Sequence, residues 1–273
     1  MGWHDRLAKS WARSGSLLCV GIDPDPVSLP EPLAGTPDAI GRFAREIVDA
    51  TADLVCAFKP QIAHFASQRA EGQLEALCRY IRETYPDVVV VLDAKRGDVA
   101  STAEHYAREA FGRYGADAVT VNPYLGTDAA RPFLEQGGVL ALCRTSNPGS
   151  GELQELDVGG RPLYQRVAEM VAGRWAEYGE CGLVVGATHP EPLAAVRALV
   201  GDLPILLPGV GAQQGDLAAS VRAGVTSDGL GLVVSSSRAI LYASRGDDFA
   251  EAARVAAIAT RDGIEAARPR PAV

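Results

Sequence analysis

Charged residues gather at the end of one apolar run, where Asp93, Lys95 and Asp98 follow the segment VVVVL at 88–92. Extended backbone places residues two apart on the same face, so Asp93 and Lys95 can point into one cavity. Carboxylates close to a lysine favour its ammonium form. A lysine that stays protonated is a proton donor rather than an amine nucleophile. The spacing therefore favours protonation of a carbanion over imine chemistry.

Two earlier apolar runs also end in charged residues: Asp23 follows the first run and Lys59 the second. Lys59 would share one small volume with Lys95 and the neighbouring carboxylates. Simpler interpretations exist for each residue. Asp23 lies in DPDP, a common turn composition, and Lys59 could be an ordinary surface lysine. Asp98 could cap the helix that follows it, and Asp93 with Lys95 could form a plain ion pair at a rim.

A phosphate site is predicted after the last two apolar runs. Gly209 and Gly211 let backbone N–H groups approach an anion, and Gln213 and Arg238 can add side-chain donors. An arginine can bind two phosphate oxygens at once. Glycines also serve ordinary turns, but barrel enzymes often hold phosphate at these two loops.

Eight short apolar runs recur along the chain, each followed by a helical pattern. They are LLCVGI (17–22), LVCAF (54–58), VVVVL (88–92), AVTV (118–121), VLALC (139–143), LVVGA (183–187), ILLPG (205–209) and LGLVV (230–234). Their nearly continuous hydrophobicity is expected of strands buried on both faces. The intervening segments carry apolar residues at helical spacing, which gives each helix one face to pack on a sheet.

Eight such units predict an α/β fold, a (β/α)8 TIM barrel with eight parallel strands; an open doubly wound sheet is the alternative. Catalytic groups of such barrels lie at the carboxyl ends of the strands. We expect a single domain over residues 1–273, with an N-terminal helix at 1–14 and a disordered tail at 267–273. The Gly-rich connection at 146–162 is long enough to be a functional lid or a disordered link, and 147–160 is expected to order on ligand binding.

Composition excludes several classes of protein. With 47% hydrophobic and 22% charged residues the chain is typical of a globular protein. A net charge of −8 argues against nucleic-acid binding, although a local pocket for a small anion can still be positive. The five scattered cysteines are expected to be reduced, and the four histidines share no metal-ligand spacing. The chain shows neither a signal peptide nor an apolar run of membrane-spanning length, so a cytoplasmic location without membrane contact is expected.

The motifs together resemble the orotidine 5′-phosphate decarboxylase family. VVVLDAKRGDVASTA is similar to the D-x-K-x-x-D signature that follows strand three of that family's barrel. CVGIDPDP, AFKPQIAHF, TSNPGS, PGVGAQ and SSSRAILYA match the other family blocks in order. The resemblance covers about residues 15 to 265, and DAKRGD with the TSNPGS loop is similar to the second, bacterial subgroup. Arg96 and Gly97 depart from the commoner form of the signature, which leaves the turn geometry open.

The resemblance implies a role for each site residue. Lys95 would protonate C6 of the pyrimidine after CO2 leaves, and Asp93 would lie by the substrate carboxylate and hold Lys95. Asp98 and Thr102 would reach the active site of the neighbouring subunit in a homodimer. Further implied ligands are Asp23 and Lys59 for ribose hydroxyls, Ser146 for the pyrimidine edge, and Gln213, Arg238 and the backbone of Gly211 for phosphate.

The implied reaction is decarboxylation of orotidine 5′-phosphate to UMP and CO2 in pyrimidine biosynthesis, with no metal and no organic cofactor. Two other functions remain open at this stage. One is a magnesium-dependent sugar-phosphate decarboxylase of the sister barrel family. The other is a non-catalytic nucleotide-binding barrel. A Schiff-base aldolase is a weaker alternative, because carboxylates flanking Lys95 oppose imine formation.

Overall fold

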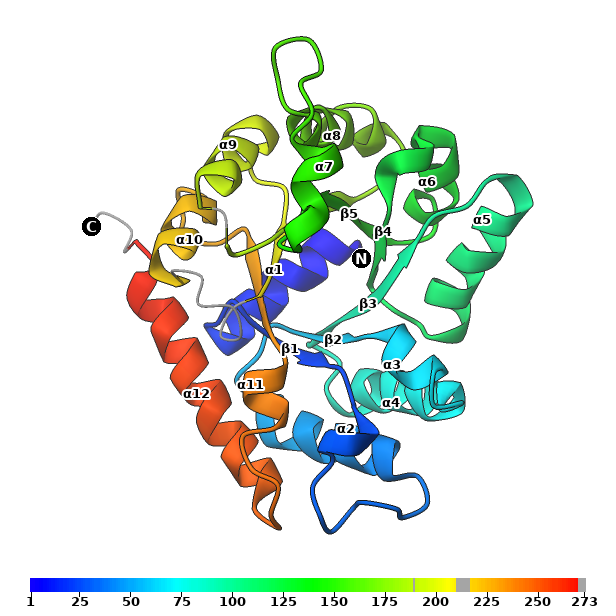
Figure 1. Cartoon of the computed structure of the whole chain (residues 1–273), viewed down its shortest axis with the longest axis vertical. Helices are drawn as coiled ribbons and strands as arrows, with labels where there is room; N and C mark the ends of the chain where they lie inside the picture. The colour runs from blue at the N-terminus through cyan, green and yellow to red at the C-terminus, as the bar shows by residue number, and fades with distance from the viewer. Residues whose placement is uncertain (189, 210–216, 270–273) are drawn as a thin grey trace.

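The computed structural model describes residues 1–188, 190–209 and 217–269 of the chain. Within these residues eight parallel strands close into a barrel, each paired with the next in chain order and β8 paired with β1 (Figure 1). The strands are β1 (Leu18–Ile22), β2 (Ala57–Pro60), β3 (Val89–Arg96), β4 (Ala118–Val121), β5 (Gly138–Arg144), β6 (Cys181–Val185), β7 (Ile205–Pro208) and β8 (Leu232–Ser236). The predicted TIM barrel is confirmed, and the open sheet is excluded by the β1–β8 pairing.

Helices surround the barrel and fill the connections between its strands. The α-helices are α1 (Trp3–Ser14), α2 (Ala39–Thr51), α3 (Ile62–Ala66), α4 (Glu71–Thr84), α5 (Ala100–Ala107), α6 (Thr127–Leu134), α7 (Gly151–Gln154), α8 (Leu163–Ala172), α9 (Pro190–Val200), α10 (Leu217–Gly224), α11 (Arg238–Leu241) and α12 (Phe249–Ala267). Short 3-10 turns are η1 (Pro26–Ser28), η3 (Pro123–Leu125), η4 (Pro148–Ser150) and η5 (Trp175–Glu177), and the π-helical η2 (Arg108–Arg113) extends α5. The last helix, α12, packs against both α10 and α2 and so closes the outer ring.

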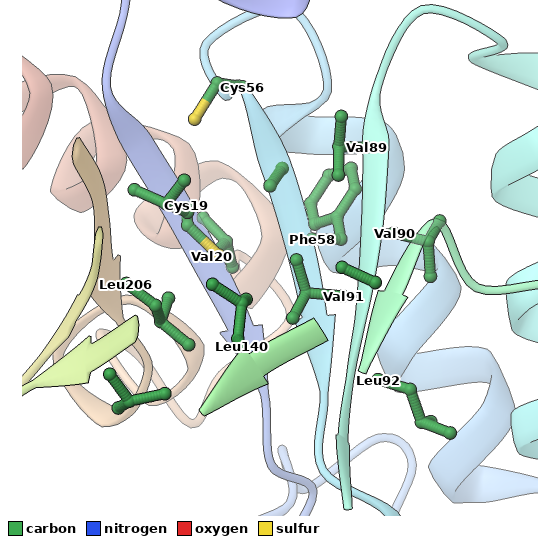
Figure 2. Close-up of a cluster of buried hydrophobic side chains, with 14 of the residues drawn as sticks. Cys19, Val20, Cys56, Phe58, Val89, Val90, Val91, Leu92, Leu140 and Leu206 are labelled. Atoms are coloured by element: carbon green, nitrogen blue, oxygen red, sulfur yellow. The ribbon is translucent and has the colours of Figure 1, made fainter. Parts of the chain in front are cut away.

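Buried apolar side chains fill the barrel and the layer between its strands and the surrounding helices. Figure 2 shows a cluster of these buried side chains, among them Val20, Phe58, Leu140 and Leu206 from β1, β2, β5 and β7. All four side chains are essentially inaccessible to solvent. Because the helices cover the outer faces as well, the strands are buried on both sides, which explains their unbroken hydrophobic sequences.

The N-terminal helix closes one end of the barrel. Trp11 donates its indole N–H to the carbonyl of Leu232 at 3.1 Å, where β8 begins. Ser10 donates to the carbonyl of Cys56 at 2.6 Å, just before β2. Helix α1 therefore crosses the amino ends of the strands, which leaves the carboxyl ends as the open mouth.

The last described residues lie beside this closed end. Ala267 is the last residue of α12, and the guanidinium of Arg268 donates to the carbonyl of Gly229 at 2.9 Å. Residues 270–273 lie outside the described part, so the expected disorder of the tail stays a prediction. No helix of the described residues is both long and apolar enough to span a bilayer.

Candidate active site

Four charged side chains from three adjacent strands meet at the mouth of the barrel. Lys59 Nζ lies 3.1 Å from Asp93 Oδ2 and 4.0 Å from Asp23 Oδ1. Lys95 Nζ lies 2.6 Å from Asp93 Oδ1. The predicted proximity of Lys59, Asp93 and Lys95 is confirmed, and Asp23, which was expected at the end of the first strand, joins them in place of Asp98. Lys59 and Asp93 are buried, whereas the side chain of Lys95 is 48% exposed toward the mouth.

The electrostatics keep Lys59 and Asp93 charged. Burial would raise the pKa of Asp93, but the ammonium groups of Lys59 and Lys95 outweigh it and lower that pKa to about 2. Burial would lower the pKa of Lys59, but the carboxylates of Asp23 and Asp93 outweigh it and raise that pKa above its usual value. Asp93 therefore stays an anion and Lys59 a cation near neutral pH.

A glycine on the neighbouring strand, Gly21, makes room for Ser237 beside Lys59. A Cβ atom on Gly21 would overlap the hydroxyl of Ser237 and lie 3.6 Å from Lys59 Nζ. The glycine therefore allows β1, β2 and the end of β8 to approach each other closely at the charged cluster.

Asp23 presents an unused hydrogen-bond acceptor. Its Oδ1 is buried and has no hydrogen-bond partner among the described residues. The backbone around it is held by Tyr242, whose hydroxyl donates to the carbonyl of Asp23 at 3.0 Å and accepts from Asp25 N–H at 2.7 Å. A buried acceptor without a partner is costly, so a ligand hydroxyl that donated to Asp23 would satisfy it.

Asp98 lies in the turn after β3 and contacts neither lysine in this chain. Its Oδ1 accepts from the adjacent Val99 N–H at 2.8 Å. Helix α5 begins after Val99 without a side-chain cap, so the interpretation of Asp98 as the N-cap is wrong. Thr102, on the first turn of α5, is exposed.

Arg96 and Gly97, the two residues that depart from the commoner form of the signature, lie at the end of β3 and in the turn that follows it. Arg96 points to the outside of the barrel, where its guanidinium pairs with Glu109 at 2.9 Å and stacks over the ring of Tyr106. A Cβ atom on Gly97 would lie 3.3 Å from the carbonyl of Asn122, so a glycine suits this close turn. Arg96 therefore anchors the strand end from outside, while Lys95 on the inside pairs with Asp93.

Ser146 lies beside the ends of β6 and β7. Cβ atoms built on Gly186 and Gly209 would fall 2.8 Å from Ser146 Cβ and 3.8 Å from its Oγ. The segment that follows Ser146 folds into η4 and α7 before projecting from the barrel toward α8 (Figure 1).

The base of this segment is held by a buried arginine, Arg144. Its guanidinium donates to the hydroxyl of Ser150, to the carbonyl of Thr145 at 2.8 Å and to Glu155 Oε1 at 2.6 Å. Gln154 adds a bond from the Thr145 N–H to its side-chain oxygen at 2.9 Å. The predicted lid is thus a structured loop with a charged anchor at its start.

The expected phosphate side is described only in part. Gly209 has φ +95°, a conformation that glycine tolerates and other residues rarely adopt. Arg238 is exposed at the first position of α11, directly after β8. The predicted ligands Gly211 and Gln213 lie outside the described residues. No group of three or more His, Cys, Asp or Glu side chains in the described ranges is arranged to hold a metal ion.

Two residues that organise the cluster were not predicted. Thr120 of β4 bonds to Asp93 and to the backbone of β3, and Tyr242 holds the backbone around Asp23. In AVTV the threonine resembles any β-branched strand residue, and Tyr242 lies in an ordinary amphipathic stretch. Only the presence of a hydroxyl in an otherwise apolar barrel strand could have drawn attention to Thr120.

Comparison with known proteins agrees with this geometry. The sequence model of the "Orotidine 5'-phosphate decarboxylase / HUMPS family" matches residues 16–255. An orotidine 5′-phosphate decarboxylase of Ralstonia pickettii (strain 12J) is 62% identical over 266 residues, covering 97% of this chain and 98% of the relative. One from Azoarcus sp. (strain BH72) is 61% identical over 270 residues, covering 98% of this chain and all of the relative.

A solved structure extends the likeness to three dimensions. The OMP decarboxylase of Leishmania donovani superposes with a TM-score of 0.84 at 40% identity, covering 98% of this chain and 99% of its own. The match spans the barrel and the strand ends that carry the charged cluster. The chain therefore belongs to the orotidine 5′-phosphate decarboxylase / HUMPS family.

Proposed function

We propose that this protein is a carboxy-lyase that converts orotidine 5′-phosphate to UMP and CO2 in pyrimidine biosynthesis. One observation carries the proposal above the others. The Lys95 ammonium lies 2.6 Å from a buried carboxylate at the mouth of the barrel, in a chain 62% identical to a protein named for this activity. The cluster supplies charge stabilisation and a proton without a cofactor, and none is proposed.

The reaction needs a cation where negative charge develops. Breaking the bond between C6 and the carboxylate releases CO2 and leaves the electron pair on C6. The Lys95 ammonium stabilises that pair electrostatically and then transfers a proton to C6, which gives UMP. Lys95 is suited to this step because its side chain is half exposed to the mouth, whereas Lys59 is buried between two aspartates.

Asp93 holds both lysines and faces the substrate carboxylate. Its pKa of about 2 keeps it ionised, so it orients the ammonium of Lys95. Its negative charge also repels the substrate carboxylate that lies beside it in this proposal. Asp23 and Lys59 are proposed to bind ribose hydroxyls. The support is that Asp23 Oδ1 is buried and lacks a hydrogen-bond partner among the described residues.

The rest of the substrate is assigned to the later strands. Ser146 is proposed to read the pyrimidine edge, since it borders the ends of β6 and β7. Arg238, Gln213 and the backbone of Gly211 are proposed to bind the phosphate, on the position of their segments after β7 and β8. Phosphate contacts far from C6 can supply binding energy for the chemical step.

We also propose that the protein works in the cytoplasm as a homodimer with shared active sites. Asp98 and Thr102 would then serve the neighbouring subunit. Asp98 makes no contact with Lys95 in its own chain in the described residues, and Thr102 is exposed, both of which suit that role. The five buried, unpaired thiols suit a reducing compartment.

A spectrophotometric assay tests the proposal directly. Purified protein is mixed with orotidine 5′-phosphate, and loss of substrate absorbance is followed with and without EDTA. Turnover that is insensitive to the chelator is expected. Loss of turnover with EDTA would favour the magnesium-dependent alternative, and UMP binding without turnover would favour a non-catalytic barrel.

A further inference from the structure

The strand that carries Asp93 and Lys95 contains an insertion relative to its neighbour. The flanking register pairs are Leu92 with Val119 and Arg96 with Val121. Residues 93–95 of β3 therefore stand opposite one residue of β4, Thr120. Bulges of this kind bend a strand and redirect its side chains, and they are frequent beside active sites.

The hydroxyl of Thr120 makes three hydrogen bonds, all to this bulge. It accepts from Ala94 N–H at 3.0 Å and from Lys95 N–H at 2.9 Å. It donates to Asp93 Oδ1 at 2.9 Å. A threonine hydroxyl has one proton and two lone pairs, so this set uses its full capacity. With both lone pairs taken by amides, the proton is directed at the carboxylate.

The backbone at the bulge is in a conformation that needs such support. Lys95 has φ +47°, in the left-handed region that residues other than glycine rarely adopt. Strain of this kind persists only where surrounding contacts impose it. The Lys95 N–H bond to Thr120 is such a contact, and Thr120 itself is 1% exposed and held within β4.

The two lysine contacts meet at the same carboxylate. Asp93 Oδ1 accepts from both Thr120 Oγ1 and Lys95 Nζ, while Asp93 Oδ2 accepts from Lys59 Nζ. The Thr120 hydroxyl therefore fixes the rotation of the carboxylate and, through the backbone, the origin of the Lys95 side chain. The positions of the Asp93 carboxylate and of Lys95 therefore both depend on the neutral hydroxyl of Thr120.

We infer that Thr120 is a positioning residue, which sets the Asp93 carboxylate and the Lys95 ammonium in their reactive geometry from the neighbouring strand. The inference rests on the proposed decarboxylase function for its kinetic readout. Thr120 does not touch the substrate in this assignment. Its removal should therefore lower the rate of the chemical step and leave substrate binding largely intact.

The test uses two variants at position 120. Thr120→Val keeps the branched shape and removes the hydroxyl, and Thr120→Ser keeps the hydroxyl. We expect Thr120→Val to lower kcat about 100-fold with KM changed less than about threefold, because a misplaced catalytic group costs about that much. Thr120→Ser should recover kcat to within about tenfold of the original protein, since the donor and both acceptor sites remain.

A matched control separates positioning from general stability. Thr51 of α2 is fully buried, and its hydroxyl donates to the carbonyl of Ile47 at 2.7 Å, away from the charged cluster. Thr51→Val removes a buried hydroxyl in the same way. It should leave kcat within about twofold of the original, whatever its effect on thermal stability.

Three results would overturn the inference. These are unchanged kcat in Thr120→Val, equal loss of kcat in the valine and serine variants, and a loss that appears in KM alone. If Thr120→Val fails to fold, Thr120→Ala takes its place with the same expectations.

Crystal structures keep this inference separate from the proposed function. If the unmodified protein does not turn over orotidine 5′-phosphate, the proposed function fails by itself. The position of Lys95 is then compared in crystals of the Thr120 and Thr51 variants. Lys95 leaving the left-handed region only in the Thr120 variant supports the inference. An unchanged Lys95–Asp93 pair in that variant contradicts it.

Discussion

Lys95 is an exposed charge on a strained backbone, whereas Lys59 is a buried charge on a regular strand. Lys95 presents its ammonium to the mouth of the barrel, where a ligand can reach it. Lys59 binds the Asp93 carboxylate within the buried part of the cluster. The two lysines differ in environment although both contact Asp93. This difference supports the proposed role of Lys95 as proton donor and leaves Lys59 to hold Asp93 and the proposed ribose site.

Replacing Lys95 should abolish turnover and preserve the fold. Lys95→Ala is expected to lower kcat at least about 1,000-fold, because the proton donor and the stabilising charge are both lost. The free energy of unfolding should change by less than about 1 kcal/mol, since a half-exposed ion pair contributes little. Lys95→Gly should be equally inactive but more stable than Lys95→Ala by about 1 kcal/mol, because glycine accepts the left-handed backbone.

Enzyme kinetics and urea unfolding of the two variants check this prediction. Near-normal turnover in either variant would contradict the assignment of Lys95 as proton donor. An alanine variant at least as stable as the glycine variant would contradict the backbone argument.

Asp93 should stabilise the fold over a wide pH range. Its pKa falls to about 2 in the folded protein, below the value of about 3.9 expected in the unfolded chain. A lowered carboxyl pKa gives stability that is present above the unfolded value and is lost as pH falls toward the folded one. Asp93→Asn also leaves Lys59 buried without its nearest partner, which should cost about 3 kcal/mol near neutral pH.

The measurement is the difference in free energy of unfolding between the original protein and Asp93→Asn across pH. It should be constant between about pH 5 and pH 9 and shrink from about pH 4 downward. Lys59 does not disturb this window, because its raised pKa gives stability that is lost only above the unfolded value of about 10.4. Glu135→Gln, in an exposed pair with Arg131, is the control. A difference that declines already near pH 6 would count against the buried pair.

At the level of elements, the connection from β5 to α8 is a folded loop, held at its base by Arg144 and near its tip by Arg166 of α8. Arg144 is 3% exposed and joins the end of β5 to Ser150 of η4 and to Glu155 beyond α7. Ser146 lies between the anchor and the first turn of the loop. The position of this proposed substrate contact therefore depends on Arg144.

Arg144→Met should loosen residues 145–156 while leaving the barrel folded. Loss of several charge-assisted hydrogen bonds should raise protease cleavage in this segment about tenfold or more. KM for the nucleotide should rise because Ser146 loses its fixed position. Arg131→Met, which removes an exposed arginine from a helix pair, is the matched control. Limited proteolysis with mass spectrometry locates the cuts, and equal cleavage in both variants would refute the anchor.

The same experiment addresses the expectation that 147–160 orders on ligand binding. Cleavage in this segment can be compared with and without a tight nucleotide inhibitor. Protection by the inhibitor is expected, and identical patterns would remove the idea.

At the scale of the whole molecule, stability and chemistry occupy opposite ends of the barrel. Helix α1 closes the amino ends of the strands with Trp3, Leu7, Ser10 and Trp11 buried, and the charged cluster lies at the carboxyl ends. Between the two ends lie buried apolar side chains, a cluster of which is shown in Figure 2. Changes at α1 should therefore affect unfolding far more than catalysis.

Trp11→Ala tests this separation. The substitution removes a buried ring and its hydrogen bond to Leu232, which should lower the free energy of unfolding by about 3 kcal/mol or more. The kcat of the folded protein should stay within about twofold of the original. Val255→Ala, at a side chain 62% exposed, is the control for both measurements. A large fall in kcat at full folding would show coupling between the two ends.

The sequence was sufficient for the barrel because its strands are specified by local burial. Continuous apolar runs at eight places predicted eight strands, and β4 was predicted to the residue at 118–121. Boundaries were less accurate where burial extends beyond the strand. The run at 54–58 predicted a strand that begins only at Ala57, because Leu54 and Val55 are buried in the preceding connection.

The sequence predicted most residues of the charged cluster, but it did not predict how they contact each other. Strand-end position identified Asp23, Lys59, Asp93 and Lys95, since parallel strands bring their carboxyl ends to one edge. The motif spacing also placed Asp98 beside them, yet the chain turns away after Arg96. The role of Thr120 depends on how β3 and β4 pair, which no local pattern encodes.

Sequence alone therefore determined which residues lie at the mouth of the barrel, because hydrophobic periodicity and strand order are properties of the linear chain. The tertiary structure decided which of these residues form ion pairs and hydrogen bonds with each other. Closure of the barrel fixes the register between neighbouring strands, and a bulge in that register aims Lys95 and Asp93 at each other. Contacts set by register are non-local, so they become visible only when the strands are paired.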